Sequence, residues 1–217
     1  ATDHEKLQNY LDNLNYTNSP KLYYEERLSS SIHGYTNQAF PNANIQYHIV
    51  NYYDDYDFDN DGIADYSYTF QGLPGEQNNT QGSGFGLATG CKRLILGTSD
   101  WLIHIAFFDA QGRLIQTRKN NHRSLTMDNL STSVYNFSNQ LKVNKVFHNA
   151  GLGLQTTVVN KFNYDHVGRL ISTFQNNNTS SDQQIAKYEY NELGQLIDKK
   201  LHALADGTFL QSIDYRY

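Results

Sequence analysis

The second half of the chain alternates short apolar segments with polar turns. Residues 101–108 and 113–117 are rich in aromatic and branched side chains, which suit a half-buried strand. Between them, Asp109 favours the first position of a type I turn because its side chain bonds its own backbone, and Gly112 can take the left-handed conformation that closes the bulge. The pattern predicts a β-hairpin.

This pattern recurs along the chain as an aromatic residue, Asp or Asn, two variable residues, Gly, a polar residue, Leu and Ile. The copies begin at Phe108, Tyr135, Tyr164 and Tyr190. The steps are 27, 29 and 26 residues, and a further step of 27 reaches Tyr217. In the second copy Asn139 replaces the glycine, and Asn also tolerates positive φ. Because one hairpin cannot bury its apolar face alone, this period predicts an all-β fold in which successive hairpins stack into one continuous sheet.

The turns of this repeat supply the first set of candidate site residues, which have a structural role. We expect Arg113 and Arg169, which follow the turn glycines, to bond to a neighbouring turn rather than to a ligand. The predicted turn residues are Asp109, Gly112, Asp165, Gly168, Asn191 and Gly194.

The first hundred residues are less regular. Thr2 and Glu5 have the spacing of a capping box, and apolar residues follow at helical intervals, so we expect a short helix over about residues 3–14. We expect strands over 46–53, 66–70 and 93–96, and a glycine-rich loop over 72–90. The predicted organisation is a helical lead-in (1–32), an irregular β region with an Asp-rich loop and a Gly-rich linker (33–100), and the repeats (101–217).

The segment 57–65, with the sequence DFDNDGIAD, is the sharpest chemical motif. Its carboxylates occupy positions 1, 3, 5 and 9 of a calcium loop, and a glycine stands at position 6 for the tight turn. Position 12 is Tyr68 instead of a bidentate Glu, which argues against a helical EF-hand. The alternative is a solvated acidic turn, since Asn-Asp-Gly is itself a turn signal. The expected calcium ligands are the side chains of Asp57, Asp59, Asp61 and Asp65 and the carbonyl of Ile63.

Charge and composition narrow the classes of function. Residues 1–100 carry a net charge of −8 and residues 101–217 one of +3, and six acids fall within 54–65, so nucleic acid is a poor partner. No apolar run is long enough to predict a membrane span. The single cysteine, Cys91, lacks a nucleophile signature, and the eight histidines form no ligand pair. We therefore expect no catalytic residues and no enzyme activity.

The Tyr-Asp-x-x-Gly-Arg-Leu-Ile unit at this period resembles the YD repeat of Rhs proteins, which also occurs in toxin-complex subunits and teneurins. Longer stretches (33–37, 51–58, 190–201 and 209–217) resemble the large Rhs-repeat proteins of Bacteroidetes. In such families the repeats spiral into a hollow β-shell that encloses a C-terminal toxin or effector. The resemblance implies a secreted or cell-surface scaffold of a polymorphic toxin used in interbacterial competition. Its partners would be the rest of the same shell, the enclosed toxin domain and the secretion machinery.

One departure limits what the resemblance implies. Rhs proteins of this type place an Asp-Pro self-cleavage site after the shell, but none of the three prolines, at positions 20, 41 and 74, follows an Asp. No autoproteolysis is therefore assigned to these residues, and we expect the array and the toxin to continue beyond residue 217. The alternative function is an extracellular adhesion module whose tyrosine-rich face binds glycan or a surface partner.

Overall fold

The computed structural model describes residues 2–16, 24–39, 44–77, 84–151, 153–178 and 180–217. The chain divides into two compact units, one made of Ala1–Tyr47 and Asp57–Asp65 and the other of His48–Tyr56 and Tyr66–Tyr217. The predicted Asp-rich loop (57–65) thus belongs to the N-terminal unit, although the segments before and after it in the sequence, 48–56 and 66–217, belong to the other unit. Part of the predicted glycine-rich loop, residues 78–83, lies outside the described residues.

The N-terminal unit contains the helix α1 (Asp3–Tyr16), as predicted. The capping box forms: the Glu5 amide donates to Thr2 Oγ1 (3.3 Å), and the Thr2 amide donates to the Glu5 carboxylate (2.7 Å). Elsewhere in this unit, Gly34 (φ 73°) lies so close to Phe58 that an added Cβ would clash with the Phe58 carbonyl oxygen. Only glycine fits at position 34, and Phe58 is fully buried.

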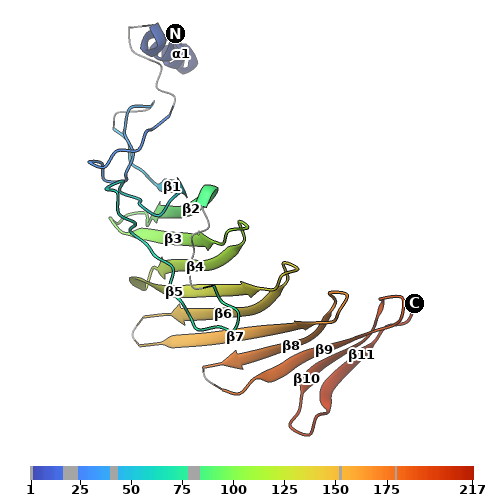
Figure 1. Cartoon of the computed structure of the whole chain (residues 1–217). Coiled ribbons are helices and arrows are strands. Elements are labelled where there is room, and N and C mark those ends of the chain that lie inside the picture. Colours follow the sequence, from blue (N-terminus) through green and yellow to red (C-terminus); the bar gives the residue numbers. More distant parts are fainter. Residues whose placement is uncertain (1, 17–23, 40–43, 78–83, 152, 179) are drawn as a thin grey trace. The chain divides into compact units, whose positions relative to one another are not determined.

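The C-terminal unit is one antiparallel sheet of eleven strands in sequence order, each paired with its neighbours in the chain (Figure 1). Among the described residues, this confirms the all-β prediction, with one short helix. The strands are β1 (Ile49–Asp54), β2 (Gly84–Leu94), β3 (Trp101–Phe108), β4 (Leu114–Asn121), β5 (Ser124–Tyr135), β6 (Leu141–Asn149), β7 (Gln155–Tyr164), β8 (Leu170–Asn177), β9 (Gln183–Tyr190), β10 (Leu196–Ala203) and β11 (Phe209–Asp214).

Each repeat turn is followed by a β-bulge; the sequence pattern predicted a bulge at the turn glycine, but not the position after the repeat Leu where the register shifts. The repeat aromatic pairs with the repeat Leu, and the residue after that Leu has no partner in the register. A bulge of this kind adds local twist to the strand pair. The residues skipped in the register are Ile115, Lys142, Ile171 and Ile197.

Two secondary-structure predictions are wrong. Residues 66–70 form no strand: the Thr69 amide donates to Gln116 Oε1 (2.9 Å), and Gln116 Nε2 donates to the Thr69 carbonyl (2.8 Å), so a side chain takes the place of a neighbouring strand. Residues 84–90 are strand instead of loop. Glycine suits this strand because an added Cβ on Gly84 would lie 2.8 Å from the Asp54 carbonyl oxygen of β1.

Part of the buried core of the sheet unit lies beneath residues 66–77, which we call the strap. The strap crosses one face of the sheet over β3, β4 and β5 (Figure 1). Beneath it, Ile105 and Phe107 of β3 are at most 1 % exposed. Tyr56 stacks on Phe107 (ring centroids 4.7 Å apart), and Tyr68 of the strap meets the same ring edge-on (6.1 Å). The strap therefore supplies a local second layer to a one-layer sheet.

Candidate functional site

Four repeat turns lie at the same end of the strands, where β3, β5, β7 and β9 each lead into the next strand. In the first, one carboxylate oxygen of Asp109 accepts hydrogen bonds from the amides of Gln111 (2.9 Å) and Arg113 (3.0 Å). The other accepts one from Arg113 Nε (2.6 Å). Backbone bonds between Asp109 and Arg113 and between Gly112 and Asp109 close the turn, with Gly112 at φ 73°. The Asp109 side chain is 1 % exposed, so the carboxylate is fully enclosed by its own turn.

The polar residue after the glycine is chemically matched to the Asp or Asn at the start of the turn. Asp165 repeats the first arrangement with Arg169, whose Nε donates to its carboxylate at 2.6 Å. Where the turn begins with Asn, a Gln replaces the Arg: the Asn amide nitrogen donates to the Gln Oε1 at 2.8 Å in both remaining turns. Charged and neutral pairs therefore alternate from one turn to the next. In order they are Asp109–Arg113, Asn136–Gln140, Asp165–Arg169 and Asn191–Gln195.

Successive turns are also bonded to one another. Arg113 Nη1 donates to Asn139 Oδ1 (2.9 Å) in the next turn, as expected from the sequence, and its guanidinium lies over the Tyr135 ring (5.1 Å). Gln140 Nε2 donates to the Gly168 carbonyl (2.6 Å) one turn further on. The Arg169 guanidinium lies over the Tyr190 ring (4.7 Å). This set of contacts, here called the turn ladder, ties each hairpin to the following one.

The repeat tyrosines complete the turn ladder through bonds that the sequence analysis missed. Each tyrosine hydroxyl donates to the carbonyl of the repeat Leu one hairpin earlier, at 2.8 to 3.1 Å. The fixed step between copies is the signal that could have revealed this pairing, because an aromatic that recurs at every hairpin must meet an equivalent neighbour. The pairs are Tyr135–Leu114, Tyr164–Leu141 and Tyr190–Leu170.

The electrostatics of the charged turns follow from these bonds. Burial raises the pKa of Asp109, but the hydrogen bonds from the Arg113 amide, its guanidinium and the Gln111 amide together outweigh burial, so the pKa lies below its ordinary value. The pKa of Asp165 is lowered in the same way by Arg169 and Val167. Both carboxylates are thus held ionised, which suits a structural ion pair.

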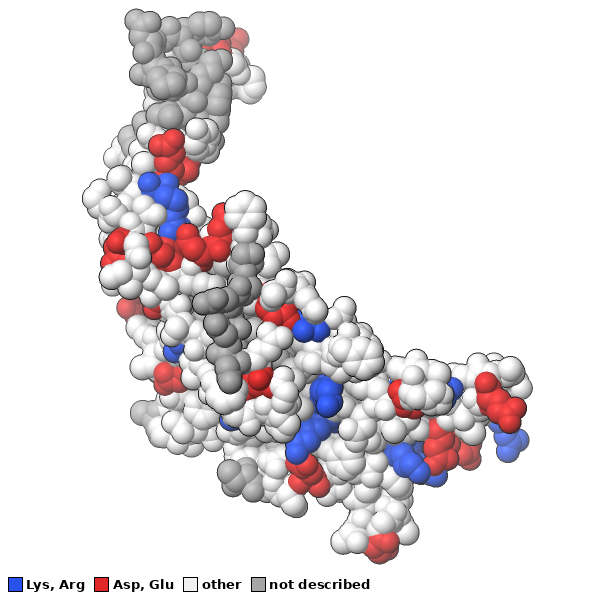
Figure 2. Space-filling view, in the orientation of Figure 1, with Lys and Arg blue, Asp and Glu red and all other residues white. Residues whose placement is uncertain are grey.

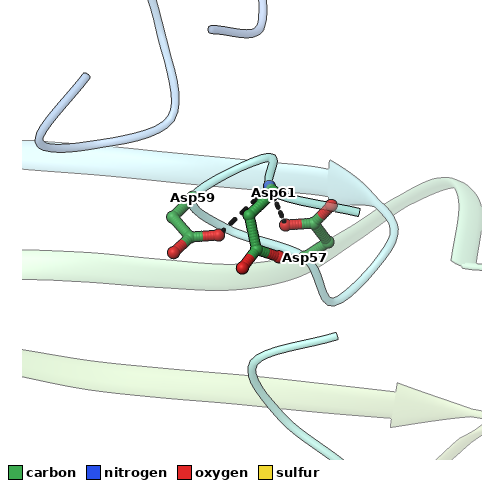
Figure 3. Close-up of side chains that lie close together, drawn as sticks. All are labelled: Asp57, Asp59 and Asp61. Atoms are coloured by element: carbon green, nitrogen blue, oxygen red, sulfur yellow. Dashed lines mark hydrogen bonds between the residues drawn. The ribbon is translucent and has the colours of Figure 1, made fainter. Parts of the chain in front are cut away.

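The Asp-rich loop brings three of its predicted ligands together (Figure 3). Oxygens of Asp57, Asp59 and Asp61 lie within 4.8 Å of one another, close enough for all three to reach one cation at the usual calcium–oxygen distance of about 2.4 Å. The Asp61 amide donates to Asp57 (3.1 Å) and to Asp59 (3.3 Å), and the Gly62 amide donates to Asp57 (2.9 Å). These bonds curl the backbone around the three carboxylates, an arrangement that fits a hard cation.

The two other predicted ligands are placed differently. Asp65 accepts hydrogen bonds from the amides of Phe58 (2.6 Å) and Asp59 (3.3 Å), so its carboxylate braces the start of the loop. The Ile63 side chain is exposed, and its amide donates to Asp61 (2.8 Å). Partial desolvation, followed by the charges of Asp65 and Asp61, raises the pKa of Asp59 above its ordinary value. This repulsion is what a bound cation would relieve.

A groove of about 850 Å³, which we call the turn groove, opens at the ends of the strands, between the turns that follow β5 and β7. Its apolar surface includes Phe137, which is 98 % exposed at the tip of its turn, and Phe162 of β7. Lys142 and His166 supply polar groups at its rim. The groove combines exposed aromatic rings with polar side chains, which is the chemistry of a binding surface.

Charged side chains on the C-terminal strands form a mixed network (Figure 2). Glu189 of β9 pairs with Lys200 (2.8 Å) and Lys187 (2.9 Å), and Lys200 also pairs with Asp198 (3.2 Å). Hydrogen bonds from Lys200 and Lys187 lower the pKa of Glu189 to about 2. This part of the sheet therefore presents neutralised charge rather than a field of one sign.

Comparison with protein families and curated proteins adds no relative. No protein-family model and no curated protein matches this chain. Within the described residues, no helix is long and apolar enough to cross a membrane. The resemblance to YD-repeat proteins thus depends on the repeated motif itself.

Proposed function

We propose that this chain is a wall segment of a YD-repeat β-shell that encloses a C-terminal toxin domain and helps to deliver it to competing cells. The observation that carries the proposal is the turn ladder, in which each repeat tyrosine donates to the Leu carbonyl of the preceding hairpin. A wall built in this way extends by adding hairpins without any new kind of contact. The proposed location is outside the cell or at its surface, and the proposed partners are the rest of the shell, the toxin and the secretion machinery.

The physical work of such a wall is exclusion. Backbone bonds between all eleven strands leave no gap within the sheet, so water and proteases would be kept from one side of it. The alternating Asp–Arg and Asn–Gln pairs would help to fix the step between hairpins, because the side chains of Arg113 and Gln140 each donate to the next turn. The bulge after each turn would add the twist that a spiralling wall needs. On this proposal the chain acts as a scaffold, without a catalytic role.

Calcium is proposed as a structural ion of the N-terminal unit. The support is the ligand spacing together with the convergence of Asp57, Asp59 and Asp61. The ion would neutralise three carboxylates that otherwise repel one another and would couple the stability of the loop to the metal concentration. Asp65 and the Ile63 carbonyl remain proposed ligands.

Limited proteolysis of the full-length protein tests enclosure. The proposal predicts that the C-terminal domain survives at protease concentrations that degrade the same domain produced alone. Equal rates of degradation in the two samples would rule out a shell around that domain. A variant carrying a protease site within an exposed turn of the array serves as the control that the protease is active.

A glycan-binding or surface-binding module is the second candidate, and the turn groove, between the turns that follow β5 and β7, favours it. The exposed ring of Phe137 is placed to stack on a sugar. Replacing it (Phe137→Ala) would abolish binding to an oligosaccharide array if this function holds, whereas Leu193→Ala, at the exposed tip of another turn, would leave binding unchanged. If the unmodified chain bound no oligosaccharide on the array, this candidate would be rejected.

A further inference from the structure

A second, smaller cavity lies where the strap crosses the sheet. It has a volume of about 310 Å³ and is lined from the strap and from strands β4 to β7. Its apolar wall includes Leu130 of β5 and Phe147 of β6, and its polar groups include Thr69, Arg118, Lys145 and Asp128. We call this cavity the strap pocket. At the low end of the volumes of small-ligand sites, it has room for only a short segment of a ligand.

Two cations share the face of the sheet that the strap covers. Arg118 is in register with Leu130, and Leu130 is in register with Phe147. Lys145 lies two residues before Phe147 on the same strand, and side chains two residues apart in a strand point to the same face. Arg118 and Lys145 therefore project toward the strap pocket together.

Arg118 retains an unused donor inside the protein. Its Nη1 donates to the Ser67 carbonyl (3.0 Å) and its Nη2 to the Met127 carbonyl (3.4 Å). Its Nε is buried and has no hydrogen-bond acceptor among the described residues. Leaving a charged donor without an acceptor is unfavourable, so a small shift of the Arg118 side chain that exposes this atom to an acceptor from outside the chain would be favoured.

The chain supplies no carboxylate to either cation. Neither Arg118 nor Lys145 forms an ion pair with a described residue, and none of the undescribed residues is Asp or Glu. Asp128 also lines the pocket, but its carboxylate accepts from Thr126 Oγ1 and from Asn149 Nδ2 (2.8 Å). On β7, by contrast, Lys161 is paired with Asp182. Hydrogen bonds from the neutral side chains of Thr126 and Asn149 leave the charge of Asp128 in place, so two cations and one carboxylate give the strap pocket a net charge of +1.

We propose that the strap pocket binds a peptide carboxylate with an apolar side chain next to it. Arg118 Nε and the Lys145 ammonium would hold the carboxylate, since a guanidinium and a carboxylate match in geometry. Leu130 and Phe147 would pack against the neighbouring apolar side chain, which favours a peptide over inorganic phosphate. Binding of such a peptide would stand whether or not the sheet encloses a toxin.

The test measures binding of two short peptides to the full 217-residue chain by isothermal titration calorimetry. The probes are acetyl-Leu-Glu-Leu-amide and its Gln counterpart, which has the same shape without the charge. The pocket predicts binding of the Glu peptide that weakens with salt, and binding at least about tenfold weaker for the Gln peptide. Equal affinity for both peptides, or no binding of the Glu peptide, would overturn the proposal. Tighter binding of inorganic phosphate than of the Glu peptide would also overturn it.

Variants locate the binding. Lys145→Gln should weaken binding of the Glu peptide about tenfold without unfolding the chain, because Lys145 makes no hydrogen bond with described residues. Lys142→Gln, on the same strand but at the rim of the other groove, is the matched control and should leave binding unchanged. Arg118→Lys keeps the charge and removes Nε, so it should also weaken binding. Equal effects of the Lys145 and Lys142 variants would place the peptide elsewhere and contradict the assignment.

Discussion

Exchange of one charged turn pair for the neutral pair found in the neighbouring turns is the sharpest test of the turn ladder. Asp109→Asn alone keeps the two backbone hydrogen bonds but sets an amide nitrogen against Arg113 Nε, so that two donors face each other in a site that is 1 % exposed. Arg113→Gln alone leaves the enclosed carboxylate without its counter-charge. We expect each single variant to lose about 2–3 kcal/mol of unfolding free energy.

The double variant, which combines Asp109→Asn with Arg113→Gln, restores a matched pair. Asn136 and Gln140 show that an Asn–Gln pair closes the same kind of turn with an amide hydrogen bond of 2.8 Å. Only the bonds from the arginine to the next turn are lost, so the double variant should lose about 2 kcal/mol in total. The resulting coupling free energy is at least about 2 kcal/mol.

Urea denaturation, followed by the fluorescence of Trp101, measures these values. Trp101 is the single tryptophan and lies on β3, the strand that leads into this turn. The same exchange at Asp165 and Arg169, whose side chains are 15 % and 32 % exposed, is the matched comparison and should give a smaller coupling. Additive effects at the Asp109 turn, within about 0.5 kcal/mol, would refute the matched-pair interpretation.

Three further predictions concern a glycine, a carboxylate and the Asp-rich loop. Gly168→Ala should lower the unfolding free energy by about 2 kcal/mol, because its φ is 88° and the new Cβ would displace the Gln140 amide. Gly207→Ala, with φ 84° and open space around it, is the control and should lower it by only about 1 kcal/mol in the same denaturation assay. Because the folded pKa of Glu189, about 2, is below its ordinary value of 4.5, its stabilisation is fully present above pH 4.5 and is lost as the pH falls through 2; Glu189→Gln should therefore destabilise by about 1 kcal/mol at neutral pH and by progressively less as the pH falls from 4.5 to below 2. Calcium should raise the melting temperature in calorimetry relative to a chelator, and Asp59→Asn should remove that increase; an identical calcium response in the variant would count against the loop as the site.

The hairpins were the most predictable part of the fold. A turn such as Asp109 to Gly112 is specified locally. The Asp side chain accepts hydrogen bonds from backbone amides of its own turn, and the glycine takes the positive φ that the same turn needs. The repetition of that turn then made a continuous sheet the simplest way to bury the apolar faces. Both inferences needed no knowledge of distant contacts.

Features that depend on distant partners were not predictable. Tyr66, Tyr68 and Phe70 alternate as a strand does, yet the backbone of Thr69 bonds to the side chain of Gln116, 47 residues away. Similarly, the Leu-Ile end of the repeat is compatible with plain alternation, and only the register reveals that the second residue is a bulge.

The Asp-rich loop shows the same division between spacing and geometry. The spacing predicted four carboxylate ligands, and the three that lie within five residues converge because the local turn brings them together. Asp65 lies further along and instead accepts bonds from backbone amides at the start of the loop. Ligand spacing alone does not tell which carboxylate a backbone amide will engage.

Electron cryomicroscopy of the full-length protein tests the central claim most directly. If the repeat array is shell wall, the particles will be closed and hollow, residues 101–217 will lie in the wall, and density for another domain will fill the interior. An open or rod-shaped particle, with both faces of the sheet in solvent and no enclosed density, would contradict the shell.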